Sequence, residues 1–389
     1  MATDNGTPSR STRRRTTIVV GAATAGALVF IGAPVTAMAL TGTFSSSHGT
    51  AVANAPIAAT GWTSHTTLTR AALKAISKAA GTDPNYYAYV AAAGGDEVVE
   101  VNVAAGTIAG TIAADTGEGV SATPDGSEVY IAETGQYYVL AVNPVTQAQT
   151  KIEVGAYPQD VAVSPSGKVV YATVTGGDSG PGGSDAVAVI DPATSTVSRD
   201  IRVGTAPRQV VFSPDGSTAY VTTETGIYVI DTATSAVVRV INDPAGPQGI
   251  ALSPDGSTLY VTNPDAGTLL KIRAASGRVI DSIQAGAEPY SVTVTPDGSR
   301  LYVADTNSDS VSVISTATGK VTGTISVGLL PVSVAISPDG SQVWVGNGLS
   351  GSVSIISTAT NTVVATVAGG SGTSTLDAAM TGITFAPAP

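Results

Sequence analysis

The stretch SPDGSTLYVTN, residues 253–263, decides the fold of this chain. The proline presets φ, Asp255 suits the next turn position, and Gly256 supplies the positive φ that closes a tight turn. Beyond the turn, Leu259 and Val261 alternate with residues of other kinds, which is the period-two pattern of a strand. The stretch therefore predicts a hairpin between two antiparallel strands.

Five further copies of this turn divide most of the chain into units of about 40 residues. Each unit continues with an aromatic residue in its second strand, a third strand, a turn that begins with Asp, Asn or Ser, and a fourth strand. A glycine-rich insertion at residues 176–185 explains the one longer interval. Four short antiparallel strands per unit are typical of a propeller blade. The turn prolines that mark the units are Pro124, Pro165, Pro214, Pro254, Pro296 and Pro338.

The two ends of the repeat region complement each other. Residues 86–112 contain the aromatic Tyr89 and two further strands but no first strand, whereas residues 382–387 resemble a first strand that stops at the turn proline. Joining them completes a seventh blade and leaves no unpaired edge at the seam. We therefore expect residues 86–389 to form an all-β, seven-bladed β-propeller of four-stranded antiparallel blades, closed by the C-terminal strand in the N-terminal blade.

This pattern resembles the YVTN β-propeller repeat family. Its phrase stands intact as Tyr260-Val261-Thr262-Asn263, and variants occupy residues 220–223, 302–305 and 344–347. The resemblance covers the whole repeat region. It implies the propeller fold and an exported bacterial protein, and it implies almost nothing about activity.

Residues 1–39 have the pattern of an export signal. Arginines at residues 13–15 precede an apolar run, residues 18–31, and a small-x-small triplet that ends at Ala39. We expect cleavage after Ala39, with Ala53 as a second candidate. The alternative is an uncleaved anchor, because the uncharged stretch is long enough to span a bilayer. The protein is then secreted and extracellular, or membrane-anchored and facing outside.

Two further segments precede the repeats. Residues 40–64 are rich in Ser, Thr and Ala without periodicity, which predicts a flexible linker. Residues 65–85 predict a short amphipathic helix, with Leu68 and Ile76 on one face and Pro84 as a stop signal. We expect this helix to pack on the outside of the propeller or to close one end of its channel.

Composition excludes several functions. The formal charge is −11, and without residues 1–40 it is −14, so nucleic acid is not an expected partner. There is no cysteine, and the two histidines, His48 and His65, both precede the first blade. A Ser-His-Asp triad or a histidine-ligated haem, copper or zinc inside the ring is therefore disfavoured. We expect a monomer.

Oxygen donors recur at the position that closes the second strand. Glu133, Asn263, Asp305 and Asn347 occupy it in four blades, and carboxylate and amide oxygens suit Ca²⁺. Similar residue types surround the channel of gluconolactonase-like calcium propellers, which differ in blade count and repeat phrase. Two interpretations stay open: these residues form a Ca²⁺ site at the channel mouth, or they are ordinary strand-end turn residues. We expect no other cofactor.

The entries into the first strands lie on the same face as these positions and supply a candidate ligand-binding surface. By contrast, the seven second-strand aromatics are expected to pack between blades. The entry residues are Gln159, Asp160, Arg208, Gln209, Gln248, Glu288 and Tyr290.

Two functions fit these observations. We favour a secreted or cell-surface scaffold without catalytic activity, whose acidic channel mouth binds a protein, a peptide or a glycan. The alternative is a Ca²⁺-dependent lactonase or esterase, with Glu133 or Asp160 as general base. A membrane is a partner only if the leader is retained.

The leader generates a first testable prediction. Mature protein isolated from culture medium should begin at Leu40, or near Asn54 if the second site is used, because signal peptidases cut after small residues. N-terminal sequencing of the secreted and membrane fractions measures this. A membrane-bound chain that keeps Arg13 would show that the leader is an anchor.

Overall fold

The structure, a computed structural model, describes residues 86–93, 97–103, 107–155, 157–176, 185–243, 245–368 and 379–387, all within the unit Trp62–Pro389. The expected export signal, linker and amphipathic helix lie outside these residues. In the described ranges no helix is long and apolar enough to cross a membrane.

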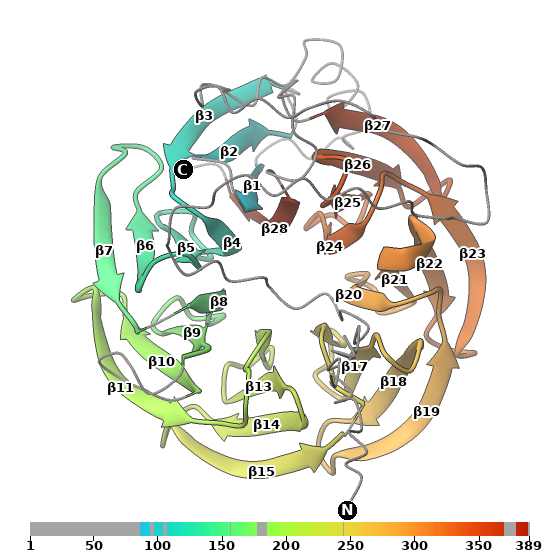
Figure 1. The fold of residues 1–389 in the computed structure, drawn as a ribbon, viewed down its shortest axis with the longest axis horizontal. Helices are drawn as coiled ribbons and strands as arrows, with labels where there is room; N and C mark the ends of the chain where they lie inside the picture. The colour runs from blue at the N-terminus through green and yellow to red at the C-terminus, as the bar shows by residue number, and fades with distance from the viewer. Residues whose placement is uncertain are drawn as a thin grey trace, which may run out of the picture. The chain divides into compact units, whose positions relative to one another are not determined.

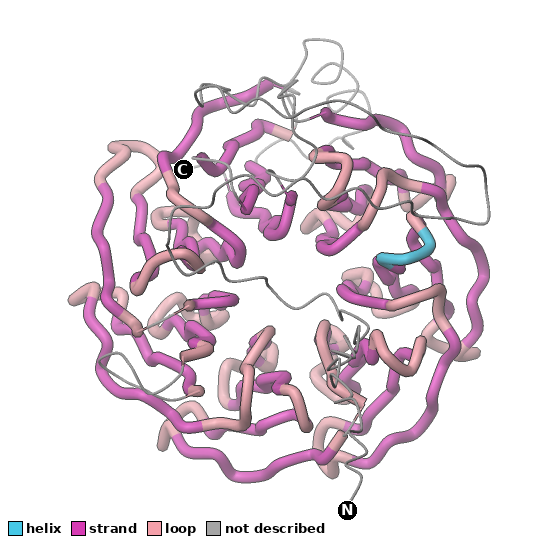
Figure 2. Tube along the Cα trace, in the orientation of Figure 1, coloured by secondary structure: helices cyan, strands magenta, loops and turns pink. Residues whose placement is uncertain are grey.

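The described chain forms twenty-eight strands in seven four-stranded antiparallel sheets around a common axis (Figure 1), which confirms the predicted seven-bladed propeller. The first strand of each blade lies nearest the axis and the fourth lies at the rim. Short loops join the strands, and one 3-10 turn, η1 (Thr306–Ser308), is the single helical element seen in Figure 2.

The blades are numbered here along the chain, and their strands have the following bounds. Blade 1 contains β28 (Ala379–Pro387), β1 (Tyr86–Ala93), β2 (Glu97–Asn102) and β3 (Thr107–Ala113). Blade 2 contains β4 (Gly117–Ala122), β5 (Val129–Glu133), β6 (Tyr138–Val142) and β7 (Gln149–Glu153). Blade 3 contains β8 (Pro158–Val163), β9 (Val170–Val174), β10 (Ala186–Asp191) and β11 (Thr196–Arg202). Blade 4 contains β12 (Val210–Phe212), β13 (Thr218–Thr223), β14 (Gly226–Asp231) and β15 (Ala236–Asn242).

The remaining three blades follow the same order. Blade 5 contains β16 (Ile250–Leu252), β17 (Thr258–Asn263), β18 (Thr268–Arg273) and β19 (Arg278–Gln284). Blade 6 contains β20 (Pro289–Val294), β21 (Arg300–Asp305), β22 (Ser310–Ser315) and β23 (Lys320–Ser326). Blade 7 contains β24 (Pro331–Ile336), β25 (Gln342–Asn347), β26 (Ser352–Ser357) and β27 (Thr362–Ala368).

The repeated turn is held together by its own polar residues. In blade 5, Gly256 has a φ of +72°, and its N–H donates to the Ser253 carbonyl at 2.8 Å. Asp255 Oδ1 accepts from the Ser253 hydroxyl at 2.5 Å and from the Ser257 N–H at 3.0 Å. These hydrogen bonds, the one from Ser253 first, lower the pKa of Asp255 to about 2. The turn joins the first and second strands, as the sequence predicted.

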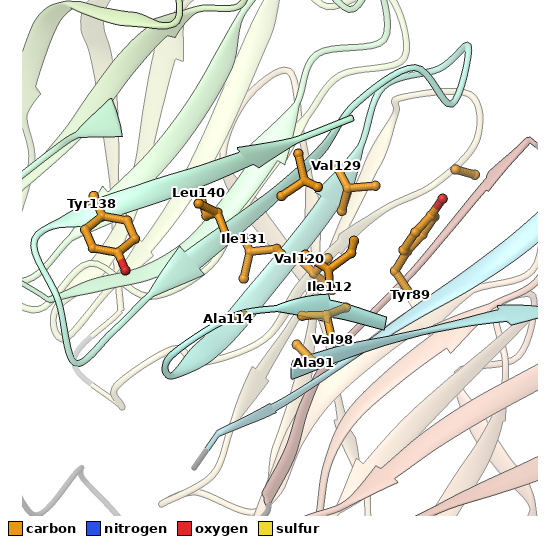
Figure 3. Packing of buried hydrophobic residues seen from close by; sticks show 12 residues of the cluster. Tyr89, Ala91, Val98, Ile112, Ala114, Val120, Val129, Ile131, Tyr138 and Leu140 are labelled. Carbon is orange, nitrogen blue, oxygen red and sulfur yellow. The ribbon is translucent and has the colours of Figure 1, made fainter. Parts of the chain in front are cut away.

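The hydrophobic core is divided among the seven contacts between blades. Each of seven clusters combines buried residues of two neighbouring blades. Figure 3 shows the cluster in which Tyr89 and Val98 of blade 1 pack with Val129 and Ile131 of blade 2. The prediction that the second-strand aromatics pack between blades is confirmed, since each cluster contains one of Tyr89, Tyr130, Tyr171, Tyr220, Tyr260, Tyr302 and Trp344.

The C-terminal strand closes the ring, as the sequence predicted. β28 pairs antiparallel with β1 from Tyr86↔Pro387 to Ala93↔Ala379. Phe385 on β28 meets two aromatic rings edge-on, Tyr86 at 5.8 Å between centroids and Trp344 of blade 7 at 5.6 Å. The last strand of the chain thus completes blade 1 and packs against blade 7.

This seam generates a prediction about stability. Phe385→Ala removes both edge-to-face contacts and leaves a cavity, so we expect a loss of about 2–4 kcal/mol. The melting temperature should fall by roughly 3–6 °C, measured by calorimetry. Thr384→Ala, on the same strand, should cost less than about 1 kcal/mol. Equal melting temperatures for Phe385→Ala and the parent would show that the seam does not limit stability.

Candidate functional site

The threonine of the repeat phrase joins the second strand to the next blade in blades 3, 4 and 5. In three consecutive blades its hydroxyl donates to the carbonyl of a residue that leads into the neighbouring first strand. Thr173 donates to Arg208 at 2.6 Å and Thr222 donates to Gln248 at 2.8 Å. Thr262 donates to the Tyr290 carbonyl at 2.8 Å. These bonds hold the main chain of three residues of the predicted ligand-binding surface. They do not involve the side chains of those residues.

Three of these side chains, together with Glu118 of blade 2, belong to innermost strands or the loops that lead into them and lie close enough to interact. Burial raises the pKa of Tyr290, and the Glu118 carboxylate raises it further, whereas the Arg208 guanidinium and the Gln248 amide lower it. Electrostatic influence falls steeply with distance, so groups from blades 2, 4, 5 and 6 lie near one phenol. The structure therefore brings together Glu118, Arg208, Gln248 and Tyr290, named here the axis cluster.

Arg208 is the one basic residue in the described innermost strands and the loops that lead into them. Its Nη1 donates to the carbonyls of Gly246 and Pro247, both at 3.4 Å, which is long for such bonds. Among the described residues, its other nitrogens have no protein partner. A half-buried guanidinium with unused donors is suited to bind an anion.

Glu118 was not singled out by the sequence. Its strand begins with Gly117, where five other blades have proline. The start of β4 therefore lacks the proline that marks a first strand elsewhere. Counting residues back from the turn proline identifies Glu118. Glu118 precedes its turn proline by six residues, as Arg208, Gln248 and Tyr290 precede theirs. Burial raises the pKa of Glu118, and the Thr134 hydroxyl opposes this.

Two other residues of the predicted ligand-binding surface bond to the next blade of the ring. Asp160 Oδ2 accepts from the Val210 N–H of the next blade at 3.0 Å, and Gln209 Oε1 accepts from the Ile250 N–H at 3.1 Å. Burial raises the pKa of Asp160 to about 6, against the lowering effect of the Val210 N–H. These two side chains point between blades, so the structure does not place them in the axis cluster.

The other two predicted residues, Gln159 and Glu288, lie at the entries of blades 3 and 6. Gln159 Nε2 donates to the Tyr157 carbonyl at 3.4 Å. Glu288 has a φ of +52° immediately before the first-strand proline, and its carbonyl accepts from the Thr306 N–H at 3.0 Å. Both side chains are half-buried.

The four residues predicted to bind Ca²⁺ are buried, each with partners in its own blade or in the loop that leads into that blade. Glu133 Oε2 accepts from the Thr116 N–H at 2.7 Å, and Asn263 Nδ2 donates to Asp243 Oδ2 at 2.9 Å. Asn347 Nδ2 donates to the hydroxyls of Ser352 and Ser354. Oxygens of Glu133, Asn263 and Asn347 lack a partner, but they lie in three different blades.

Asp305, the fourth, accepts from the Gly286 N–H at 3.0 Å and from the Ser312 hydroxyl at 2.6 Å. In the described part of the chain, no three His, Cys, Asp or Glu side chains are grouped so that they could hold a metal. The hydrogen bonds of the four residues are separate, with no partner shared between any two of them. Calcium binding stays a prediction from the sequence.

Comparison with known proteins agrees with the fold and is sparse on function. Residues 183–327 match the family model described as a lactonase, seven-bladed β-propeller. No curated protein matches the chain. The chain therefore has the architecture of a seven-bladed propeller, and its central part is similar to that of lactonase-type propellers.

Two solved structures share this architecture. A hydrazine synthase from Kuenenia stuttgartiensis is 24% identical over 68% of this chain and 90% of that one, with a TM-score of 0.62. A functionally unknown protein from Desulfotomaculum acetoxidans is 12% identical over 78% of this chain and 99% of that one, with a TM-score of 0.65. Identities this low support the fold alone.

Buried Asp305 generates a prediction about pH. Burial raises its pKa from 3.8 to about 6 in the folded state, so ionisation opposes folding. This cost is absent below about pH 3.8, grows up to about pH 6, and is complete above. Asp305→Asn removes it and can keep both hydrogen bonds, as Asn347 does with its serines in blade 7.

We therefore expect Asp305→Asn to be more stable than the parent by about 2–3 kcal/mol at pH 8, with no advantage near pH 4. Thermal melts of both proteins across this range measure the difference. Asp265→Asn, at an exposed position in blade 5, is the control and should follow the parent. A constant difference between Asp305→Asn and the parent at all pH values would contradict the assignment.

Proposed function

We propose that this protein is a binding module that holds a small, carboxylate-bearing ligand in the axis cluster and has no catalytic activity. The observation that carries the proposal is Arg208, a half-buried guanidinium whose only hydrogen bonds among the described residues are two long bonds to carbonyls. A planar guanidinium binds a carboxylate through two parallel hydrogen bonds.

The neighbouring groups suit the uncharged part of such a ligand. Gln248 offers an amide that donates and accepts, and Tyr290 offers a phenol at the edge of an apolar ring. The threonine hydroxyls fix the backbone beneath these residues. A site that is ordered before binding loses less entropy on association, which favours affinity for a small ligand.

Lactone hydrolysis is a second candidate, favoured by the family match at residues 183–327, which includes Arg208 and Tyr290. The pKa of Glu118 is raised towards neutral pH, and a general base is most effective when its pKa lies near the pH at which it works. It would take a proton from water as the water oxygen attacks the lactone carbonyl, and return it to the ring oxygen as the C–O bond breaks. Arg208 would stabilise the negative charge that develops on the carbonyl oxygen.

Glu118 replaces the two bases suggested by the sequence. Glu133 is wholly buried in blade 2 and accepts from a backbone N–H. Asp160 accepts from the next blade. Glu118 is the carboxyl that lies close to both Tyr290 and Asp160, on the axis side.

We also propose that the protein acts outside the cell as a monomer. Export rests on the leader-like sequence of residues 1–39. The monomeric state is supported by the rim: in six blades the pairing of the third and fourth strands shifts register by a bulge. Bulges twist an exposed edge away from pairing with another chain.

The proposal predicts binding of simple sugar acids, measured by titration calorimetry with gluconate and galacturonate against the neutral glucitol and galactose. Hydrogen bonds to charged groups contribute about 1.5–3 kcal/mol, so Arg208→Ala should weaken carboxylate binding about 10–100-fold. Arg202→Ala, an exposed arginine on the rim strand β11, should bind as the parent does.

Turnover separates the two candidates. The parent and Glu118→Gln are given gluconolactone, and acid release above the spontaneous rate is followed. We expect no difference between them. Turnover that is lost in Glu118→Gln would establish the hydrolase and overturn the non-catalytic role. If neither sugar acid binds, or if Arg208→Ala binds them unchanged, the carboxylate site is wrong.

A further inference from the structure

One repeat position has an unusual backbone conformation. The residue before the first-strand proline, or its equivalent, is left-handed in five consecutive blades: Tyr157 (φ 50°), Ala206 (49°), Gly246 (68°), Glu288 (52°) and Leu330 (55°). This region is strained for residues with a side chain, and for bulky residues most of all. Glycine fits it without strain, as Gly246 in blade 5 illustrates.

Tyr157 is the bulkiest of these residues. The fold does not need a tyrosine there, because Glu288 and Leu330 occupy the same place in blades 6 and 7, and their carbonyls accept the same backbone bond from the N–H groups of Thr306 and Gly348. The Tyr157 carbonyl accepts from the Thr175 N–H at 3.1 Å, a bond that any residue could make. The repeat imposes the left-handed backbone, but a bulky side chain in it adds strain that the fold does not need, and strain of this kind clusters at functional sites.

The Tyr157 ring lies beside a second, exposed ring. Its centroid is 6.5 Å from that of Tyr137, with 45° between the planes. Tyr137 is 53% exposed and is the one aromatic residue among the large exposed hydrophobics of the described chain. The Tyr137 carbonyl accepts from the N–H groups of Val154 and Gly155, at 2.9 and 3.2 Å. Both tyrosines are therefore presented from a backbone that is held in place.

We propose that Tyr137 and Tyr157 form an aromatic platform that binds a neutral oligosaccharide, at a site separate from the axis cluster. A tyrosine ring packs on the apolar C–H face of a sugar ring, and its hydroxyl bonds to sugar hydroxyls. Neither tyrosine carries a charge at neutral pH, so the pair offers no partner to an anion and suits a neutral ligand. The Gln159 side chain, bonded to the Tyr157 carbonyl at 3.4 Å, adds a polar group beside the platform.

The test measures affinity for cellohexaose, maltohexaose, chitohexaose and mannohexaose by NMR titration. At least one should bind the parent. Tyr137→Ala and Tyr157→Gly should each weaken that binding at least tenfold, while Tyr157→Phe, which keeps the ring, should stay within about threefold of the parent. Because glycine relieves the strain at position 157, the melting temperature of Tyr157→Gly should stay within a few degrees of the parent or rise.

Two controls separate this site from the rest of the molecule. Leu330→Gly makes the same backbone change in blade 7 and should not alter sugar binding. Arg208→Ala, which tests the axis cluster, should not alter it either. The proposal is overturned if none of the four sugars binds, if a sugar binds equally to both tyrosine variants, or if Arg208→Ala abolishes binding. If Tyr157→Gly fails to fold, the affinity of Tyr137→Ala, which changes an exposed residue, decides between the same outcomes.

Discussion

The contact between neighbouring blades is the interaction on which this structure depends. A single blade has apolar side chains on both faces of its sheet, and neither face can be covered without a neighbour. All seven hydrophobic clusters therefore join two blades, each around one second-strand aromatic. Such an arrangement has no natural end, so the ring must close. The pairing of β28 with β1, and the rings of Tyr86, Trp344 and Phe385 around it, meet this requirement.

The fold could be predicted because its determinants are local and repeated. The turn phrase marks the first hairpin of six blades, its spacing gives the length of a blade, and the first strand missing at one end appears at the other. The aromatic positions could be assigned for the same reason: a large ring at a fixed place in each repeat has to meet an equivalent surface in the next blade. None of these inferences needed knowledge of which side chains meet across the axis.

The candidate site could be predicted only in part, because its contacts join different blades. Arg208 and Gln209 are adjacent in sequence, yet one faces the axis and the other accepts a hydrogen bond from Ile250 in the next blade. Alternation shows that they point apart but not which of them faces the axis. Similarly, Glu133 and Asp305 have the residue types of calcium ligands, but loop N–H groups already bind their carboxylates. Such partners come from turns whose paths the repeat pattern does not specify.

The seven copies of the repeat also show which positions the fold leaves free. The aromatic position is tyrosine in six blades and tryptophan in one, as expected for a residue that fills a fixed volume. Six residues before the turn proline the opposite holds. There, in three blades, the repeat threonine bonds to the main-chain carbonyl and not to the side chain, so this bond places no demand on residue type. That position can change its chemistry without cost to the ring, and it does so around the axis: Glu118, Gln159, Arg208, Gln248, Tyr290, Val332 and Thr381.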